Sequence, residues 1–128
     1  MTPRDVFKLE ELLVRLQNDD EIIRIILRQF ISDTPRQIAE MQVSVSACDH
    51  EAVRILAHTI KGAAATVAGN ELSFLASAIE QAAKSGKMEK AGGPLRDLPN
   101  AFSRFLQEVI RTGFYSGATS DNFQEKSQ

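Results

Sequence analysis

The chain has 128 residues, of which 43% are hydrophobic and 25% are charged, and its formal net charge is −2. This length and composition suit a single globular domain with its own core. The balanced charge gives no reason to expect nucleic acid binding, which needs a concentrated basic face. No apolar run approaches the roughly 20 residues of a membrane span, and the N-terminus lacks the apolar block of a signal peptide. We therefore expect a cytoplasmic chain without direct membrane contact, either free-standing or part of a larger membrane-anchored protein.

Apolar residues recur with helical spacing from the start of the chain. The pattern predicts a short amphipathic helix over residues 6–16 and a long one over residues 21–47, separated by the N-cap candidates Asn18, Asp19 and Asp20. Pro35 lies inside the long segment and cannot donate a backbone hydrogen bond. We expect it to kink the helix near residues 32–34, or to divide it into two collinear helices.

Three further helices are predicted in the second half of the chain. Asp49 is a suitable N-cap for a helix that ends near residue 68. Asn70 is a suitable N-cap for the next helix, which ends near residue 85. Residues 85–94 contain three Gly and one Pro and predict a loop. The fifth helix is expected over residues 94–112, with Pro99 either disturbing its first turns or marking its true start.

The expected architecture follows from these elements. No segment alternates apolar and polar residues as a strand does, so the predicted fold is all-α, and short connections between long helices favour an up-down antiparallel bundle. The bundle is expected to occupy residues 1–113. Residues 114–128 form a polar tail without periodicity, which we predict to be disordered or a linker.

The helix over residues 49–68 carries an unusual surface. At about 100° per residue, its apolar residues form one continuous core face: Val53, Leu56, Ala57, Ile60, Ala63, Ala64 and Val67. His58 lies well off that face. Beside it are a cation, Lys61, and a mid-helix glycine, Gly62, which costs about 1 kcal/mol relative to Ala. The glycine indicates close approach, either of a neighbouring helix or of a partner or phosphoryl group.

The string from Ala57 to Ala64, AHTIKGAA, resembles the signature of histidine phosphotransfer domains: His, any residue, an aliphatic residue, Lys, Gly and small residues. The similarity extends over roughly residues 6–112, and it includes Pro35 and the pair Ile79-Glu80. One departure is visible, because many family members have Gly ten residues after the His, where this chain has Ala68. The resemblance implies a four-helix bundle with an additional short N-terminal helix.

The resemblance also implies a function and a set of roles. The domain is expected to be a non-enzymatic, monomeric relay that takes a phosphoryl group from a sensor histidine kinase or a receiver domain and passes it to a response regulator. By motif position, His58 is the phospho-acceptor and Lys61 is the cation that neutralises the phosphoryl group. Gly62 leaves room for the phosphoryl group and the partner, and Glu80 accepts the hydrogen bond from the imidazole Nδ1. Arg54, Ile55 and Ala65, with nearby residues of the second helix, are expected to contact the receiver. No cofactor is expected, and Mg²⁺ belongs to the partner receiver.

Three other interpretations stay open. The same bundle without phosphate would be a receiver-binding scaffold, although intact His58 and Lys61 argue against this. A kinase dimerisation domain also presents a His on a helical hairpin, but it carries a different acidic motif after the His. A metal or haem site could use only Cys48, His50 and His58 as soft ligands. Instead, Cys48, which has no internal disulfide partner, is predicted to be a small half-buried apolar residue, and His50 a solvated residue at a helix start.

Overall fold

A computed structural model describes residues 6–116 of the chain as helices and short connections, and this part contains no strand. The elements, in chain order, are α1 (Leu9–Arg15), α2 (Asp20–Ser46), α3 (His50–Thr66), α4 (Asn70–Lys84), the 3-10 helix η1 (Met88–Ala91) and α5 (Gly92–Thr112). The all-α prediction is confirmed.

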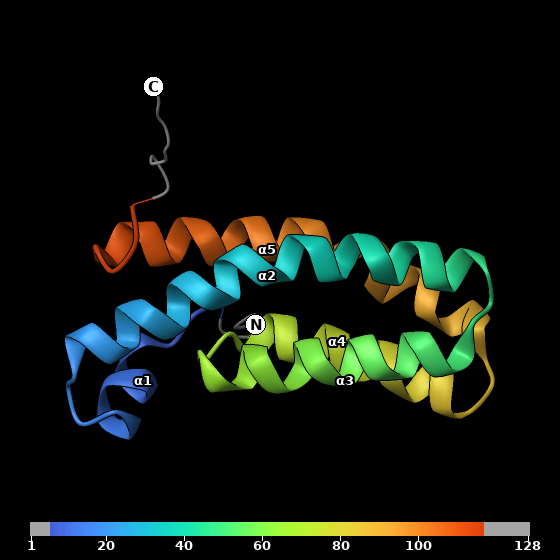
Figure 1. Ribbon diagram of the computed structural model, residues 1–128, viewed down its shortest axis with the longest axis horizontal. Helices are drawn as coiled ribbons and strands as arrows, with labels where there is room; N and C mark the ends of the chain where they lie inside the picture. Colours follow the sequence, from blue (N-terminus) through green and yellow to red (C-terminus); the bar gives the residue numbers. More distant parts are fainter. Residues whose placement is uncertain (1–5, 117–128) are drawn as a thin grey trace, which may run out of the picture.

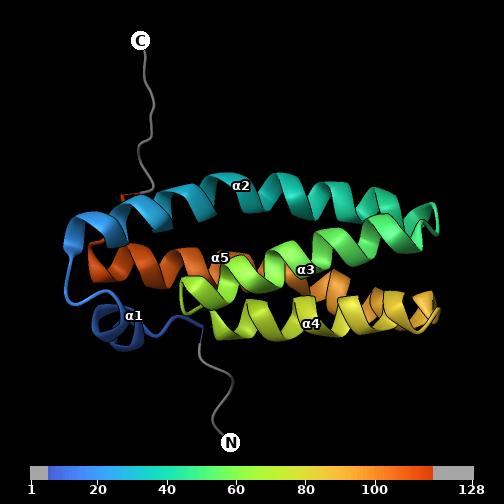
Figure 2. The same cartoon turned by 60° about the horizontal axis from the view of Figure 1, so that its bottom comes forward.

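The four long helices form the bundle (Figures 1 and 2). α2, α3, α4 and α5 run lengthwise with each antiparallel to the next, and α3 and α4 form the closest pair. α1 lies across one end, beneath the start of α2 in Figure 1. Arg15 at the end of α1 donates hydrogen bonds to the carbonyl oxygens of Ala65 and Thr66, 3.1 and 2.8 Å away, and so ties α1 to the last turn of α3. The structure confirms the four-helix bundle with an additional N-terminal helix.

The predicted apolar stripes meet in one core along the bundle axis. The largest fully buried side chains from the five helices include Leu12, Ile23, Leu27, Met41, Val53, Ile60, Leu72, Ile79, Leu98 and Phe105. The Phe105 ring makes edge contacts with Phe7 and Phe30, with centroids 5.4 and 5.1 Å apart. Burial of such a side chain stabilises the fold by about 1.5–3 kcal/mol. Ile22 in the first turn of α2 is 44% exposed and lies outside this core.

Pro35 does not divide the long segment. α2 is a single helix of 27 residues that includes Pro35, and its axis changes direction near the middle, as Figure 1 shows. A proline lacks the N–H group that would bond one turn back, and the helix bends there without ending. The structure therefore shows one bent helix and not two collinear ones.

Local signals predicted two of the helix starts correctly. The carboxylates of Asp19 and Asp49 accept hydrogen bonds from the backbone N–H groups of Ile22 and Ala52, both at 3.1 Å, and so cap α2 and α3. The expected cap by Asn70 is wrong, because Gly69 is the N-cap of α4 and makes no side-chain bond. A Cβ at Gly69 would lie 3.1 Å from Cε1 of Phe105, so packing requires a glycine there.

The ends of the other elements also differ from the prediction. The first helix covers residues 9–15, and the expected loop over residues 85–94 contains η1 and the first residues of α5. α5 begins at Gly92, and Pro99 lies inside it. Phe114 and Tyr115, placed in the polar tail by the sequence, pack against the core, and Arg24 lies over the Phe114 ring at 4.9 Å. Residues 117–128 of the predicted tail lie outside the described residues.

The connections after α2 and α3 each use one non-glycine residue in the left-handed conformation. Cys48 has φ +53° after α2, and Ala68 has φ +58° after α3. In both turns the residue that follows donates back across the helix end, from Asp49 to the Ser44 oxygen and from Gly69 to the Ala64 oxygen, as in a Schellman motif. Ala68 thus occupies the conformation that glycine favours. Cys48 is exposed, so the prediction of a half-buried residue is wrong.

None of the helices within residues 6–116 combines the length and the apolar character that a bilayer span requires.

The conformation of Cys48 yields a stability prediction. A left-handed conformation costs an L-residue about 1–2 kcal/mol, whereas Gly adds about 0.4–1 kcal/mol of unfolded-state entropy. We expect Cys48→Gly to raise the free energy of unfolding by about 0.5–1 kcal/mol, measured by urea denaturation. Cys48→Ala, which removes the thiol and keeps the strain, should change it little. Equal effects of the two substitutions would contradict this explanation.

Candidate functional site

His58 lies in the middle of α3 on the solvent side of the helix. Its side chain is 65% exposed, whereas Ala57 and Ile60 on either side are fully buried. The wheel prediction that the ring stands clear of the core therefore agrees with the structure. The ring is accessible to a partner while its backbone is fixed by the α3–α4 packing.

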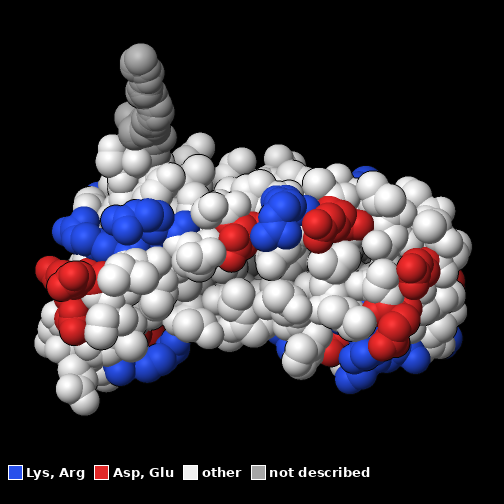
Figure 3. Space-filling view, viewed as in Figure 1, with Lys and Arg blue, Asp and Glu red and all other residues white. Residues whose placement is uncertain are grey.

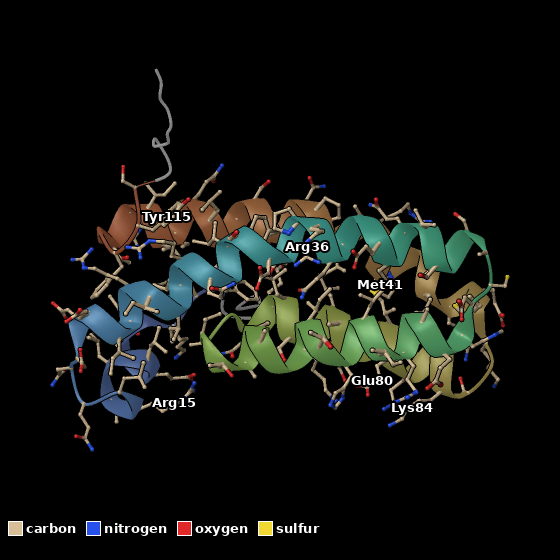
Figure 4. The ribbon with its side chains drawn as sticks, in the orientation of Figure 1. Arg15, Arg36, Met41, Glu80, Lys84 and Tyr115 are labelled. Carbon is tan, nitrogen blue, oxygen red and sulfur yellow. The ribbon has the colours of Figure 1, made fainter. Side chains whose placement is uncertain are left out.

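The imidazole is bonded to a carboxylate from the neighbouring helix. His58 Nδ1 lies 2.9 Å from Glu80 Oε2, and the Glu80 side chain is only 3% exposed. The other carboxylate oxygen forms an ion pair with Lys61, with Nζ 2.7 Å from Oε1. Lys84 adds a second cation, its Nζ 3.9 Å from Oε2. Figure 4 shows Glu80 and Lys84 along the same edge of the bundle. α3 and α4 thus bring one imidazole and two ammonium groups to one buried carboxylate.

The protonation state of Glu80 determines the tautomer of His58. The hydrogen bond from Lys61 and that from His58 lower the pKa of the Glu80 carboxyl group, against an opposing effect of burial. An ionised carboxylate can only accept hydrogen bonds, so Nδ1 of His58 must be the donor. In the neutral ring the lone pair then lies on Nε2, the nitrogen that Glu80 does not bind.

Lys84 is the site residue that the sequence prediction missed. It lies on α4, one turn after Glu80, and its side chain is 50% exposed. The spacing of four residues between a Glu and a Lys on one helix is a recognised signal of contact. It could have placed Lys84 beside the site once Glu80 was assigned to it.

Gly62 lies in open space. A Cβ at this position would meet no atom within 4 Å, so no neighbouring helix packs against it in the described part of the chain. Of the two explanations considered for this mid-helix glycine, close helix packing is therefore wrong. Clearance for an external group stays as the prediction.

A shallow apolar groove of about 340 Å³ lies between α2 and α3, and Thr59, the residue after His58, is part of its lining. Its lining residues are Ile26, Gln29, Phe30, Asp33, Thr34 and Gln37 of α2 and Thr59, Ala63, Thr66 and Val67 of α3. Within the described residues, the buried hydroxyl of Thr34 has no hydrogen-bond partner. Figure 3 shows an uncharged band along this part of the molecule, with charged residues above and below it.

The predicted docking residues lie around the same ring. Ile55 is 50% exposed, and Ala65 is exposed one turn beyond Lys61. Arg54 is bound by Glu51, with Nε 3.1 Å from Oε1 and Nη2 2.6 Å from Oε2. Ile55 and Ala65 are thus available to a partner, whereas Arg54 is already paired.

The groups considered for metal binding do not come together. His50 is the first residue of α3 and is exposed, as predicted, and Cys48 is exposed in the turn before it. Within residues 6–116 no group of three or more His, Cys, Asp or Glu side chains is arranged to hold a metal ion.

The fold and this site define a helical domain that presents one histidine, and a comparison with known families identifies it. Residues 25–109, which include His58, Lys61 and Glu80, match the model of the Hpt domain. The chain therefore belongs to the Hpt family, whose members serve as histidine phosphotransfer proteins in phosphorelays with histidine kinases and response regulators.

A solved structure has the same fold. The crystal structure of histidine-containing phosphotransfer protein B (HptB) from Pseudomonas aeruginosa PAO1 aligns with a TM-score of 0.69 and 21% sequence identity. The alignment covers 85% of this chain and 98% of that one. No curated protein sequence matches the chain.

The two glycines at Gly62 and Gly69 predict opposite effects of the same substitution. Gly62→Ala should raise the free energy of unfolding by about 0.5–1 kcal/mol, because it removes the helix penalty of glycine and meets no neighbour. Gly69→Ala should lower it, because the new methyl group presses on Phe105. Thermal and urea unfolding measure both changes. A loss of stability in Gly62→Ala would mean that the glycine serves the packing of the domain itself.

Proposed function

We propose that His58 is the phospho-acceptor of this Hpt domain. It takes a phosphoryl group from a histidine kinase or a phospho-aspartyl receiver domain and passes it to the aspartate of a response regulator. The observation that carries the proposal is the pairing of Nδ1 with the buried Glu80 carboxylate, which leaves Nε2 as the free nucleophile on an exposed ring. No other imidazole in residues 6–116 has such a partner, since His50 makes no side-chain hydrogen bond there.

The transfer balances without any proton leaving the site. The Nε2 lone pair of His58 attacks phosphorus, the N–P bond forms, and the P–O bond to the donor aspartate breaks with its electron pair on the carboxylate. Nδ1 keeps its proton, so the ring becomes positively charged, and the Glu80 carboxylate stabilises that charge through the existing 2.9 Å contact. In the forward step the receiver carboxylate attacks phosphorus, and the Nε2 lone pair is restored.

Two cations assist this exchange. The transition state of phosphoryl transfer is loose and rich in negative charge, so positioning and neutralisation provide most of the catalysis. Lys61 and Lys84 flank Glu80 and are both partly exposed, which allows either ammonium group to turn toward the phosphoryl oxygens. We expect no cofactor on this chain. The Mg²⁺ ion and the attacking or leaving aspartate are expected on the receiver.

The partner is proposed to dock across the α2–α3 groove. The exposed face of α3 that carries Ile55, Thr59 and Gly62 connects His58 with this groove. The groove is apolar with a polar rim. We expect a transient interface near the lower end of specific complexes, about 1,200 Å² or below, between a monomeric relay and one receiver.

The acceptor is tested with the two described histidines as a matched pair. We expect the wild type and His50→Gln to take up phosphate from a phosphorylated receiver, and His58→Gln to take up none, because it alone lacks the nucleophile. The readout is acid-labile, base-stable label, located by mass spectrometry. Label that persists in His58→Gln would disprove the assignment. A chain that binds receivers but takes no label from any donor would be the scaffold considered as the alternative.

The docking surface is tested by adding a charge to the groove. We expect Thr59→Lys to weaken receiver binding about tenfold or more, equivalent to about 1.4 kcal/mol, because a lysine must be desolvated at an apolar contact. Ser103→Lys on the exposed side of α5 is the control and should bind normally. Both variants should still be phosphorylated by phosphoramidate, a small donor that needs no docking. Normal receiver affinity in Thr59→Lys would place the interface elsewhere.

A further inference from the structure

One charged group beside His58 is not used by the mechanism described above. Arg54 lies one turn before His58 on α3, where residues four apart are neighbours on the helix surface. Its guanidinium group is held in a two-bond ion pair by Glu51, at 3.1 and 2.6 Å. The Arg54 side chain is 37% exposed and the Glu51 side chain 69% exposed. The pair is therefore open to solvent, and the guanidinium can leave it without unfolding the helix.

Each cation around His58 already has a carboxylate partner before phosphorylation. Lys61 and Lys84 face the single buried carboxylate of Glu80, and Arg54 faces Glu51. A phosphoryl group on Nε2 adds up to two negative charges to this cluster. Lys61 and Lys84 both compensate the Glu80 carboxylate, so a turn of either toward the phosphoryl group leaves that buried charge less well compensated. The cation that can turn toward the phosphoryl oxygens at the lowest cost is one that does not compensate the buried carboxylate.

Arg54 meets that requirement better than the two lysines do. Its present partner is an exposed carboxylate, and exposed ion pairs contribute little to stability. A guanidinium group also binds two phosphate oxygens at once, in the same fork geometry that it uses with Glu51. The pKa of Arg54 is raised mainly by the hydrogen bond and the charge of Glu51, and least by the charge of Glu80. The effect of Glu80 indicates that the guanidinium lies within electrostatic reach of the site.

We propose that Arg54 is a phosphoryl-binding residue held in reserve by Glu51, and that the guanidinium exchanges the Glu51 carboxylate for the phosphoryl oxygens once His58 is phosphorylated. The exchange is non-covalent, and it rests on the proposed acceptor function of His58. Glu51 then sets how readily the phosphorylated state forms, because it competes with the phosphoryl group for the same cation. Arg54 thereby acts on the phosphorylated state of the relay, not only as a docking residue.

The two members of the pair predict opposite effects on one equilibrium. The measurement is the ratio of phospho-His58 to phospho-receiver at equilibrium, together with the half-life of isolated phospho-His58. Arg54→Gln should shift the ratio away from phospho-His58 by about fivefold, because it removes a charge-assisted contact. Glu51→Gln should shift it about two- to threefold the other way, because the competitor is gone. The double variant should behave as Arg54→Gln alone, since no cation is left to release.

A second pair of residues provides the control. Glu108 and Arg111 on α5 have the same spacing of three residues and a similar ion pair, with Nε and Nη2 of Arg111 3.2 and 2.8 Å from Glu108 Oε1. Glu108→Gln and Arg111→Gln should leave both the ratio and the half-life unchanged. Any general effect of net charge or of helix stability would appear in these variants too.

A spectroscopic readout separates the exchange from a structural role. The Nε–H resonance of Arg54 should move on phosphorylation of the wild type, while that of Arg111 should not. The proposal is overturned if Arg54→Gln and Glu51→Gln shift the ratio in the same direction or leave it unchanged. It is also overturned if Arg54→Gln only weakens binding of the unphosphorylated partner. These results would leave the acceptor role intact, whereas a wild type that takes no label would remove both proposals.

Discussion

The site depends on one buried carboxylate. Glu80 is almost fully enclosed between α3 and α4, and a buried charge is tolerated only where partners compensate for its lost hydration. Lys61 and His58 provide the closest compensation from the facing helix. Any slip of α3 along α4 would leave the carboxylate without them, so the charge fixes the register of the two helices. The Ser73 hydroxyl, which donates to the Lys61 carbonyl oxygen at 3.2 Å, links the helices at a second point.

Fixing that register also fixes the chemistry of the ring. Nδ1 is held by an acceptor that stays ionised, and the Glu80 pKa is lowered chiefly by Lys61. Lys61 therefore acts on His58 even while it is paired with Glu80, because it helps to keep the carboxylate charged. A histidine on an exposed helix face without such a partner would sample both tautomers and several rotamers. The fold prepares one tautomer and one orientation before a phosphoryl group arrives.

The sequence predicted those features that depend on neighbours along the chain. The helices, their apolar faces and the caps at Asp19 and Asp49 follow from spacing and residue type, and the structure agrees. The errors arise where residues far apart in the chain determine a helix end or the burial of a side chain. Helix α4 begins one residue earlier than the cap signal at Asn70 predicted, so Gly69, which lies against Phe105, is the N-cap. The tail prediction missed the packing of Phe114 beneath Arg24.

The same distinction applies to the site. Sequence spacing does not show that Glu80 is buried, since only the packing of α4 on α3 buries it. The role proposed for Glu51 and Arg54 is equally invisible in the sequence, because the chain has another Glu–Arg pair with the same spacing, Glu108 and Arg111. Spacing along the sequence does not show which of the two pairs lies near the site. The folded bundle separates them, because it brings the Glu80 charge within electrostatic reach of Arg54 and not of Arg111.

Several features that do not favour stability lie on α3 and on the two helices that pack beside it. Gly62 weakens the helix without any packing need, the Thr34 hydroxyl is buried without a partner, and Glu80 is a buried charge. The opposite side of α4 uses an ordinary ion pair between Glu71 and Arg104. Natural proteins break local stability rules mainly where function demands it. Gly62 and Glu80 belong to the family resemblance, whereas the unpartnered Thr34 hydroxyl is a separate observation on the α2–α3 groove that we propose as the docking surface.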